Sequence, residues 1–257
     1  MKISAYVITL NEEIRLEKTL QALSKVADEI VVVDSGSIDR TEEIAKKYNC
    51  KFVFHKWISY SDQKYFAQEQ CKNDYVLMID ADEVLSDELI NEINNLKKQS
   101  SLYDAYNIRI VDIAPNMTKP NIFVRQFNPV RLYNKKVCSM DKNTMNKDRV
   151  DISNAKKIGQ LKNYILHYCF LSISKSVEKY NLHSDELLNT VIKDKKHYSK
   201  IRLITEFPRQ FLKYYFLQRY FAYGTFGFIR AMVLAYFRFL KVAKCIEYEL
   251  MNKKNDK

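Results

Sequence analysis

The sequence contains little glycine, proline or cysteine. Its 257 residues include only 4 Gly and 4 Pro, too few for a collagen-like chain or for one dominated by flexible linkers. The 5 Cys are odd in number, and no two have the Cys-x-x-Cys spacing. This argues against a disulfide framework or a zinc site built on cysteine pairs, and it favours a reducing compartment. No run of 18 apolar residues occurs, so an ordinary membrane-spanning helix is not expected.

What the sequence does contain is enough apolar material for a large packed domain. Hydrophobic residues make up 47% of the chain and charged residues 28%, which excludes a disordered chain. The formal net charge of +11 is unevenly spread, because residues 1–100 hold 13 Lys and Arg against 18 Asp and Glu. We therefore expect a metal or sugar site in the acidic front part and an anionic partner for the basic back part.

Short apolar runs alternate with amphipathic segments over the first 100 residues. The opening run leads directly into Asn11-Glu12-Glu13, so we interpret it as a first strand rather than as a signal peptide. Asn11 is expected to cap the first helix, and Ser86 a later one. The predicted strands are residues 3–10, 29–34, 50–54 and 74–79. Continuous Val and Ile runs are typical of parallel strands covered on both faces, so the pattern predicts an α/β, doubly wound sheet.

Two carboxylates follow the fourth predicted strand, at Asp80 and Asp82. In an extended backbone, positions i and i+2 point to the same side. Ligands bind beyond the carboxyl ends of such strands, and paired oxygen ligands suit Mg²⁺ or Mn²⁺ shared with a diphosphate. The alternative is an ordinary solvated acidic turn.

Three early motifs resemble those of family-2 glycosyltransferases. They are Thr9-Leu10-Asn11-Glu12-Glu13, the segment from Ala27 to Thr41 with Asp34-Ser35-Gly36-Ser37, and Asp80-Ala81-Asp82-Glu83. The segments Gln63–Ala67, Arg131–Tyr133 and Leu166–Tyr168 are similar to the branch that builds lipopolysaccharide cores. The resemblance implies an inverting enzyme with the GT-A fold, a mixed sheet over residues 1–200 and a basic, aromatic helical extension over residues 201–257.

The same resemblance implies a role for each matching residue. Thr9, Asn11 and Glu12 would lie along the nucleotide, and Asp34 would accept a hydrogen bond from uracil or ribose. Lys64 would lie near the nucleotide or diphosphate. Asp80 would face ribose and metal, Asp82 the metal, and His167 the metal or diphosphate. Other interpretations remain open: Asp34 as a turn residue, Lys64 as a solvated helix residue, and His167 as a structural residue.

The general base is the main departure from the family pattern. Met145-Asn146 stand where the family usually has His-Glu, and neither accepts a proton at neutral pH. The acceptor hydroxyl still needs a base. Asp148 is our candidate, and Asp141 and Asp151 are the other nearby acids. Because the departures lie on the acceptor side, we expect an acceptor that differs from the family norm.

Aromatic and basic residues dominate the C-terminal part. Residues 201–257 hold 11 Lys and Arg against 4 Asp and Glu, and cations interrupt each apolar run. This favours helices that lie on an anionic membrane surface. Packing on the domain or in a homodimer is an alternative, and nucleic acid is not expected as a partner.

Together these features predict a metal-dependent hexosyltransferase that uses Mg²⁺ or Mn²⁺. It would move glucose or another hexose from a UDP-sugar to a lipid-linked saccharide, such as a lipopolysaccharide or lipooligosaccharide core. We expect it to be cytoplasmic and peripheral on the inner face of the cell membrane. One alternative is a nucleotidyltransferase, although that class ordinarily carries a Gly-rich phosphate loop that is not seen here. The other is a catalytically impaired nucleotide-sugar-binding or scaffold homologue.

Overall fold

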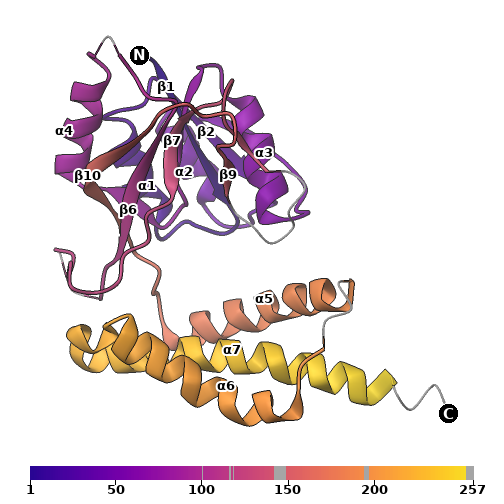
Figure 1. The fold of residues 1–257 in the computed structure, drawn as a ribbon. Coiled ribbons are helices and arrows are strands. Elements are labelled where there is room, and N and C mark those ends of the chain that lie inside the picture. The colour runs from indigo at the N-terminus through magenta and orange to yellow at the C-terminus, as the bar shows by residue number, and fades with distance from the viewer. Residues whose placement is uncertain (100, 116, 118, 142–148, 194–196, 253–257) are drawn as a thin grey trace. The chain divides into compact units, whose positions relative to one another are not determined.

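The computed structural model describes residues 1–99, 101–115, 117, 119–141, 149–193 and 197–252 (Figure 1). The chain forms two compact units. The first, here called the sheet unit, comprises Met1–Asp112 and Gln126–Cys169. The second, the helical unit, comprises Ile113–Arg125 and Phe170–Lys257. The boundary that we predicted after residue 200 falls in the first turn of a helix, Lys200–Leu212, within the helical unit. A division into a transferase domain and a membrane-associating extension remains a prediction.

The sheet unit contains a mixed sheet in the order β3-β2-β1-β4-β7-β6-β10-β5. Strands β1, β2, β3 and β4 run parallel, and so do β6 and β10. Strand β7 runs antiparallel to both β4 and β6, and β5 runs antiparallel to β10. The strands are β1 Ile3–Thr9, β2 Glu29–Asp34, β3 Lys51–Phe54, β4 Tyr75–Met78, β5 Glu83–Leu85, β6 Ala105–Asp112, β7 Val130–Asn134 and β10 Ile158–His167. A separate pair consists of β8 Ser139–Met140 and β9 Val150–Asp151.

Helices cover both faces of this sheet, as the continuous apolar strands predicted. Alternation along β1 sends Ala5 and Val7 into one core and Tyr6 into the other. The first core receives α1, α2 and α4, and the second receives α3 and the β8-β9 pair. The helices are α1 Leu16–Leu23, α2 Thr41–Lys47, α3 Tyr60–Gln70 and α4 Asp87–Leu96. The predicted doubly wound mixed sheet is therefore confirmed.

Of the two helix caps that we predicted, one is confirmed and the other is wrong. Ser86 caps α4 as expected, because its Oγ accepts a hydrogen bond from the Leu89 amide at 3.1 Å. The prediction for Asn11 is wrong: α1 begins only at Leu16, and its N-cap residue, Arg15, makes no side-chain cap hydrogen bond. Asn11 instead adopts a left-handed backbone with φ 55°, a conformation that asparagine tolerates better than most residues.

The helical unit consists mainly of three helices, α5 Ile173–Lys193, α6 Lys200–Leu212 and α7 Gly224–Asn252. Between α6 and α7 lie a π-helical turn, η1 Lys213–Leu217, and a 3₁₀ turn, η2 Tyr220–Tyr223. Both α5 and α6 pack along α7. Within the described residues, no helix is both long enough and apolar enough to cross a membrane.

Candidate active site

The predicted site residues gather where parallel strands end. Strands β1, β2 and β4 are neighbours in the sheet and run in the same direction, so their carboxyl ends share one edge. Thr9 and Asp34 are register partners at the ends of β1 and β2, and Asp80 and Asp82 follow β4. The order of the strands thus brings together residues more than 70 positions apart in the sequence.

The carboxylate of Asp34 is buried and accepts four hydrogen bonds from nearby donors. Thr9 Oγ1 and Ser37 Oγ donate to Oδ1 at 2.7 and 2.5 Å. The amides of Gly36 and Ser37 donate to Oδ2 at 2.8 and 2.7 Å, and Gly36 has the positive φ of 106° that this turn requires. Since a carboxylate offers about four acceptor positions, a hydrogen bond from a nucleotide would have to displace one of these donors. The predicted nucleotide-binding role of Asp34 stays a prediction.

The residues after β1 are tied to the same turn. The Asn11 amide donates to Ser37 Oγ at 2.7 Å, and Asn11 Oδ1 accepts from the Ile38 amide at 3.0 Å. Glu12 pairs with Arg15 through two hydrogen bonds, of 2.9 and 2.6 Å. Asn11 is exposed and Glu12 half-buried, so Asn11 is the more accessible of the two to a ligand.

Asp80 and Asp82 are not arranged as an extended pair. The Glu83 amide donates to the Asp80 carbonyl oxygen at 2.9 Å, which closes a turn over residues 80–83. Our expectation of an extended backbone here was therefore wrong, because the chain turns as soon as β4 ends. The turn gives the two carboxylates different neighbours. Asp80 faces Lys64 and Arg131, whereas Asp82 faces Arg15 and His167.

Asp80, whose side chain is 30% exposed, belongs to a cluster of four charged side chains in which the other three are buried. Lys64 Nζ lies 2.7 Å from Asp80 Oδ1, and Arg131 Nη2 lies 3.2 Å from Asp80 Oδ2 and 2.5 Å from Glu83 Oε1. Burial would raise the pKa of Asp80, but Lys64 and Arg131 outweigh it and hold that pKa well below its usual range. Burial raises the pKa of Glu83 despite the neighbouring Arg131. Paired in this way, the charges avoid the large cost of isolated ions in the core.

This cluster changes the interpretation of Lys64. The sequence suggested either a contact with the diphosphate or a solvated helix position, but the side chain is only 2% exposed. Lys64 therefore pairs with the Asp80 carboxylate and is not a solvated residue, and its predicted position near the nucleotide or diphosphate stays a prediction. We did not assign roles to Arg131 or Glu83 from the sequence, although both lie in motifs that carried the family resemblance.

Asp82 faces two basic groups from distant parts of the chain. Arg15 Nη1 lies 3.2 Å from Asp82 Oδ2, and His167 Nε2 lies 3.5 Å from Asp82 Oδ1. The other ring nitrogen of His167, Nδ1, lies 2.8 Å from Asp112 Oδ1. Burial would lower the pKa of His167, but Cys169, Asp112 and Asp82 overcome it and raise that pKa well above its usual value.

This arrangement fits a divalent cation that replaces the proton on His167, because only a neutral imidazole can bind a metal. A histidine whose second nitrogen is held by a carboxylate is the usual form of a metal-binding imidazole, and carboxylate oxygens suit Mg²⁺ and Mn²⁺. Asp112, His167 and Cys169 also offer ligand atoms that all lie within 4.8 Å of one another. Asp112 and Cys169 were missed at the sequence level. The signal for Asp112 lies in strand pairing, because it is the register partner of His167 on the neighbouring strand β6.

The proposed base cannot be placed in this site. Asp148, like Met145 and Asn146, lies outside the described residues. Its two alternatives are described: Asp141 follows β8, and Asp151 lies in β9 and is exposed. Backbone and side-chain hydrogen bonds from Ser153 lower the pKa of Asp151, which makes that carboxylate a weaker base. The identity of the general base stays a prediction.

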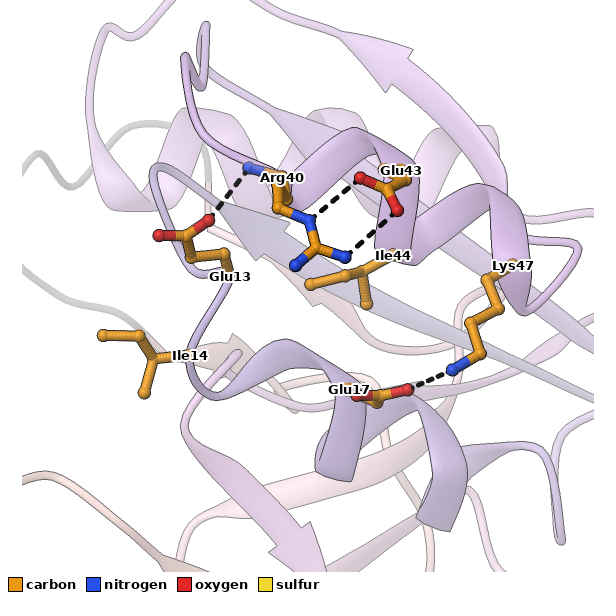
Figure 2. Close-up of a pocket in the computed structure, with 7 residues that line it drawn as sticks. All are labelled: Glu13, Ile14, Glu17, Arg40, Glu43, Ile44 and Lys47. Atoms are coloured by element: carbon orange, nitrogen blue, oxygen red, sulfur yellow. Dashed lines mark hydrogen bonds and ion pairs between the residues drawn. The ribbon is translucent and has the colours of Figure 1, made fainter.

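A hollow of about 530 Å³ lies between the start of α1 and α2, as Figure 2 shows. Its lining side chains pair with one another: Arg40 bonds Glu43, and Lys47 bonds Glu17 at 2.5 Å. The Arg40 amide also donates to Glu13 Oε2 at 3.3 Å. None of the described site residues lines this hollow, so we do not assign it to the active site.

Comparison with known proteins identifies the class. The family model for glycosyl transferase family 2 matches residues 4–150. The chain therefore belongs to the family-2 glycosyltransferases, as its motifs predicted, and its mixed α/β sheet agrees with the predicted GT-A class.

Individual relatives match over nearly the whole chain. An uncharacterized glycosyltransferase of Rickettsia bellii is 42% identical over 97% of this chain and 87% of its own length. The lipopolysaccharide core biosynthesis glycosyltransferase LpsC of Rhizobium meliloti is 31% identical over 95% of this chain and 92% of its own. Among solved structures, S. aureus TarS 1-349 in complex with UDP is 19% identical, with a TM-score of 0.47, over 87% of this chain and 73% of that chain.

Proposed function

We propose that this glycosyltransferase is a metal-dependent, inverting enzyme that moves a hexose, such as glucose, from a UDP-sugar to a lipid-linked saccharide. The observation that carries the proposal is the position of Asp82. It lies at the carboxyl edge of the parallel strands, with His167 Nε2 3.5 Å from its carboxylate and Asp112 behind the imidazole. Carboxylate and imidazole together form a donor set for Mg²⁺ or Mn²⁺.

The reaction requires three tasks of the chain. The acceptor hydroxyl attacks the anomeric carbon while the bond from that carbon to the diphosphate oxygen breaks, which inverts the configuration. A base takes the hydroxyl proton, and Asp148 remains our candidate for this task. Asp82 and His167 would hold the cation, which neutralises the charge that develops on the diphosphate. Asp80, fixed by Lys64 and Arg131, would orient the ribose and complete the metal site.

A lipid-linked saccharide, such as a lipopolysaccharide or lipooligosaccharide core, is the acceptor class that we favour. It is supported by the similarity to LpsC, whose name places that protein in lipopolysaccharide core biosynthesis, and by the basic, aromatic C-terminal part of this chain. An enzyme with such an acceptor would work at the inner face of the cell membrane, where a peripheral protein shares a surface with its substrate. The alternative is that the same C-terminal part forms the interface of a homodimer.

Calorimetry with UDP tests the donor site directly. Wild type should bind UDP more tightly in the presence of Mn²⁺ than in its absence, and Asp82→Asn should lose this difference. Asp74→Asn is a matched control, because Asp74 precedes β4 at the opposite end of the strand and forms an exposed pair with Lys136. If wild type binds no UDP in either condition, the proposed donor is wrong. If UDP binds but UDP-sugar is never consumed, even by hydrolysis, the chain is a nucleotide-sugar-binding homologue.

A further inference from the structure

Helix α6 buries polar side chains and exposes apolar ones. The two residues of this helix that are most fully buried are polar, Glu206 at 1% exposure and Gln210 at 2%. The side chains that face solvent include Ile201 at 73% and Ile204 at 79% exposure. A helix packed on a water-soluble protein normally shows the opposite arrangement.

Helical geometry shows that the exposed residues form one continuous strip. Ile201, Ile204, Pro208 and Leu212 are all exposed and follow the i, i+3, i+7, i+11 spacing that places residues on one side of a helix. We call these four residues the outer α6 stripe. Glu206 and Gln210 are four positions apart and lie on the opposite side, where α6 packs along α7. One whole face of α6, and not a single side chain, is therefore apolar and exposed.

The buried polar face is hydrogen-bonded within α6, although Gln210 Oε1 has no hydrogen-bond partner among the described residues. Arg202 Nε and Arg209 Nη2 donate to Glu206 Oε2 at 3.0 and 2.8 Å, and Gln210 Nε2 donates to Glu206 Oε1 at 2.8 Å. All of these partners belong to α6, so the network pairs the Glu206 carboxylate within the helix and allows the polar side of α6 to be buried. With Glu206 and Gln210 buried on one side of α6, the stripe on the other side faces outward.

The charges around the stripe indicate what covers it. Glu206 is the sole Asp or Glu in residues 199–219 of the sequence, while the same segment contains five cations, Lys200, Arg202, Arg209, Lys213 and Arg219. Because Glu206 is buried, the charge that this segment presents to solvent is positive. Two copies joined stripe to stripe would bring these cations together, since a two-fold interface places the same patch on both sides. An anionic surface pairs with them instead.

We propose that the outer α6 stripe is the element of this protein that enters an anionic lipid bilayer, with α6 lying in the plane of the membrane surface. The stripe would sit at the boundary between headgroups and acyl chains, and the flanking Lys and Arg would contact lipid phosphates. This inference rests on the membrane location given under Proposed function and names the residues that produce it. It is independent of the chemistry at Asp82.

Vesicle cosedimentation of the full chain tests the stripe. Wild type should bind vesicles that contain phosphatidylglycerol and bind phosphatidylcholine vesicles weakly. The triple variant Ile201→Gln, Ile204→Gln, Leu212→Gln should lose at least about tenfold in partitioning, since each removed apolar side chain weakens insertion. Leu182→Gln is the matched control, because Leu182 is a 62% exposed leucine on α5 of the same unit. It should bind like wild type.

The outcomes separate this inference from the wider proposal. If the triple variant binds like wild type, the stripe is not the lipid-contacting face, although the membrane location stands. If wild type binds neither kind of vesicle, the inference about the stripe and the proposed membrane location are both wrong. A wild-type dimer in light scattering that the triple variant loses, without vesicle binding, identifies a second copy as the occupant and overturns the inference. UDP calorimetry on the same samples reports separately on the donor site.

A fluorescent reporter placed in the stripe gives a direct measurement. Trp57 is the sole tryptophan and lies in the sheet unit, so Trp57→Phe provides a background without tryptophan. In that background, Ile204→Trp should shift its emission to the blue and be quenched by brominated lipid when phosphatidylglycerol vesicles are added. An unchanged emission from vesicle-bound protein would show that α6 stays in water.

Discussion

The Nδ1 atom of His167 lies 2.8 Å from Oδ1 of Asp112, its register partner on the adjacent parallel strand. The pairing of β6 with β10 thereby fixes which ring nitrogen of His167 faces Asp82. A carboxylate at this position sets both the tautomer and the orientation of the ring. Asp112 is therefore a positioning residue for the proposed metal ligand.

Replacement of Asp112 should weaken metal binding while the donor pocket stays intact. We expect Asp112→Asn to lower the Mn²⁺ affinity in the presence of UDP by about 10- to 100-fold, the usual effect of removing an outer carboxylate behind a metal-binding histidine. Electron paramagnetic resonance of free Mn²⁺ measures this without an activity assay. Asp74→Asn should leave the affinity unchanged, and an equal loss in both variants would contradict the positioning role.

Arg15 should compete with a cation at Asp82. Its guanidinium lies 3.2 Å from the Asp82 carboxylate and also pairs with Glu12, so a metal at Asp82 has to displace or approach a positive group. Arg15→Gln should raise the Mn²⁺ affinity in the absence of nucleotide by at least about fivefold, since a like charge at about 4 Å costs about 1 kcal/mol even at the dielectric constant of bulk water. Arg40→Gln, which removes an exposed Arg–Glu pair, is the control. A lower affinity in Arg15→Gln would show that the guanidinium supports the cation instead.

The charge cluster around Asp80 predicts a loss of stability on replacement of Lys64. Lys64→Met removes the cation 2.7 Å from Asp80 and leaves a carboxylate without one of its two partners. Breaking a fully buried pair on one side costs about 3–5 kcal/mol. Because Asp80 is 30% exposed and keeps Arg131, we expect a loss of about 2 kcal/mol, which thermal denaturation of the full chain will show as a lower midpoint. Lys136→Met breaks the exposed pair with Asp74 and should cost less than about 1 kcal/mol.

Glu206 should make the helical unit sensitive to acid. Burial raises the pKa of Glu206, but hydrogen bonds from Arg209, Arg202 and Gln210 outweigh it and lower that pKa to about 2. Because the folded pKa is depressed, the stabilisation is fully present above about pH 4.5, the unfolded value, and is lost as the pH falls towards 2.

Thermal melts of wild type and Glu206→Gln at several pH values measure this contribution. Wild type should be more stable than the variant at neutral pH by up to about 3 kcal/mol, and the difference should shrink between about pH 4.5 and 2. Glu178→Gln, which loses an exposed pair with Lys175, should show little difference at any of these pH values. A difference in stability between wild type and Glu206→Gln that stays constant with pH would contradict the lowered pKa of Glu206.

Local patterns predicted the strands and helices of the sheet unit well. Val and Ile runs placed β2 and β4 to within a residue, and Ser86 marked the start of α4. The Asn11 cap was mistaken because the same Asx side chain that caps helices also satisfies turns. In the folded chain, Asn11 bonds the Ser37–Ile38 segment, which lies 26 residues further along the sequence.

Short motifs and apolar periodicity were sufficient to predict the class of the protein and the polar residues that stand at strand ends, because both are local properties of the chain. The contacts that those residues make follow from the folded chain instead. Asp82 meets Arg15 and His167, Lys64 pairs with Asp80, and α6 turns its isoleucines outward. These outcomes depend on strand order, register and helix packing, which join segments far apart in the chain and which no local pattern specifies.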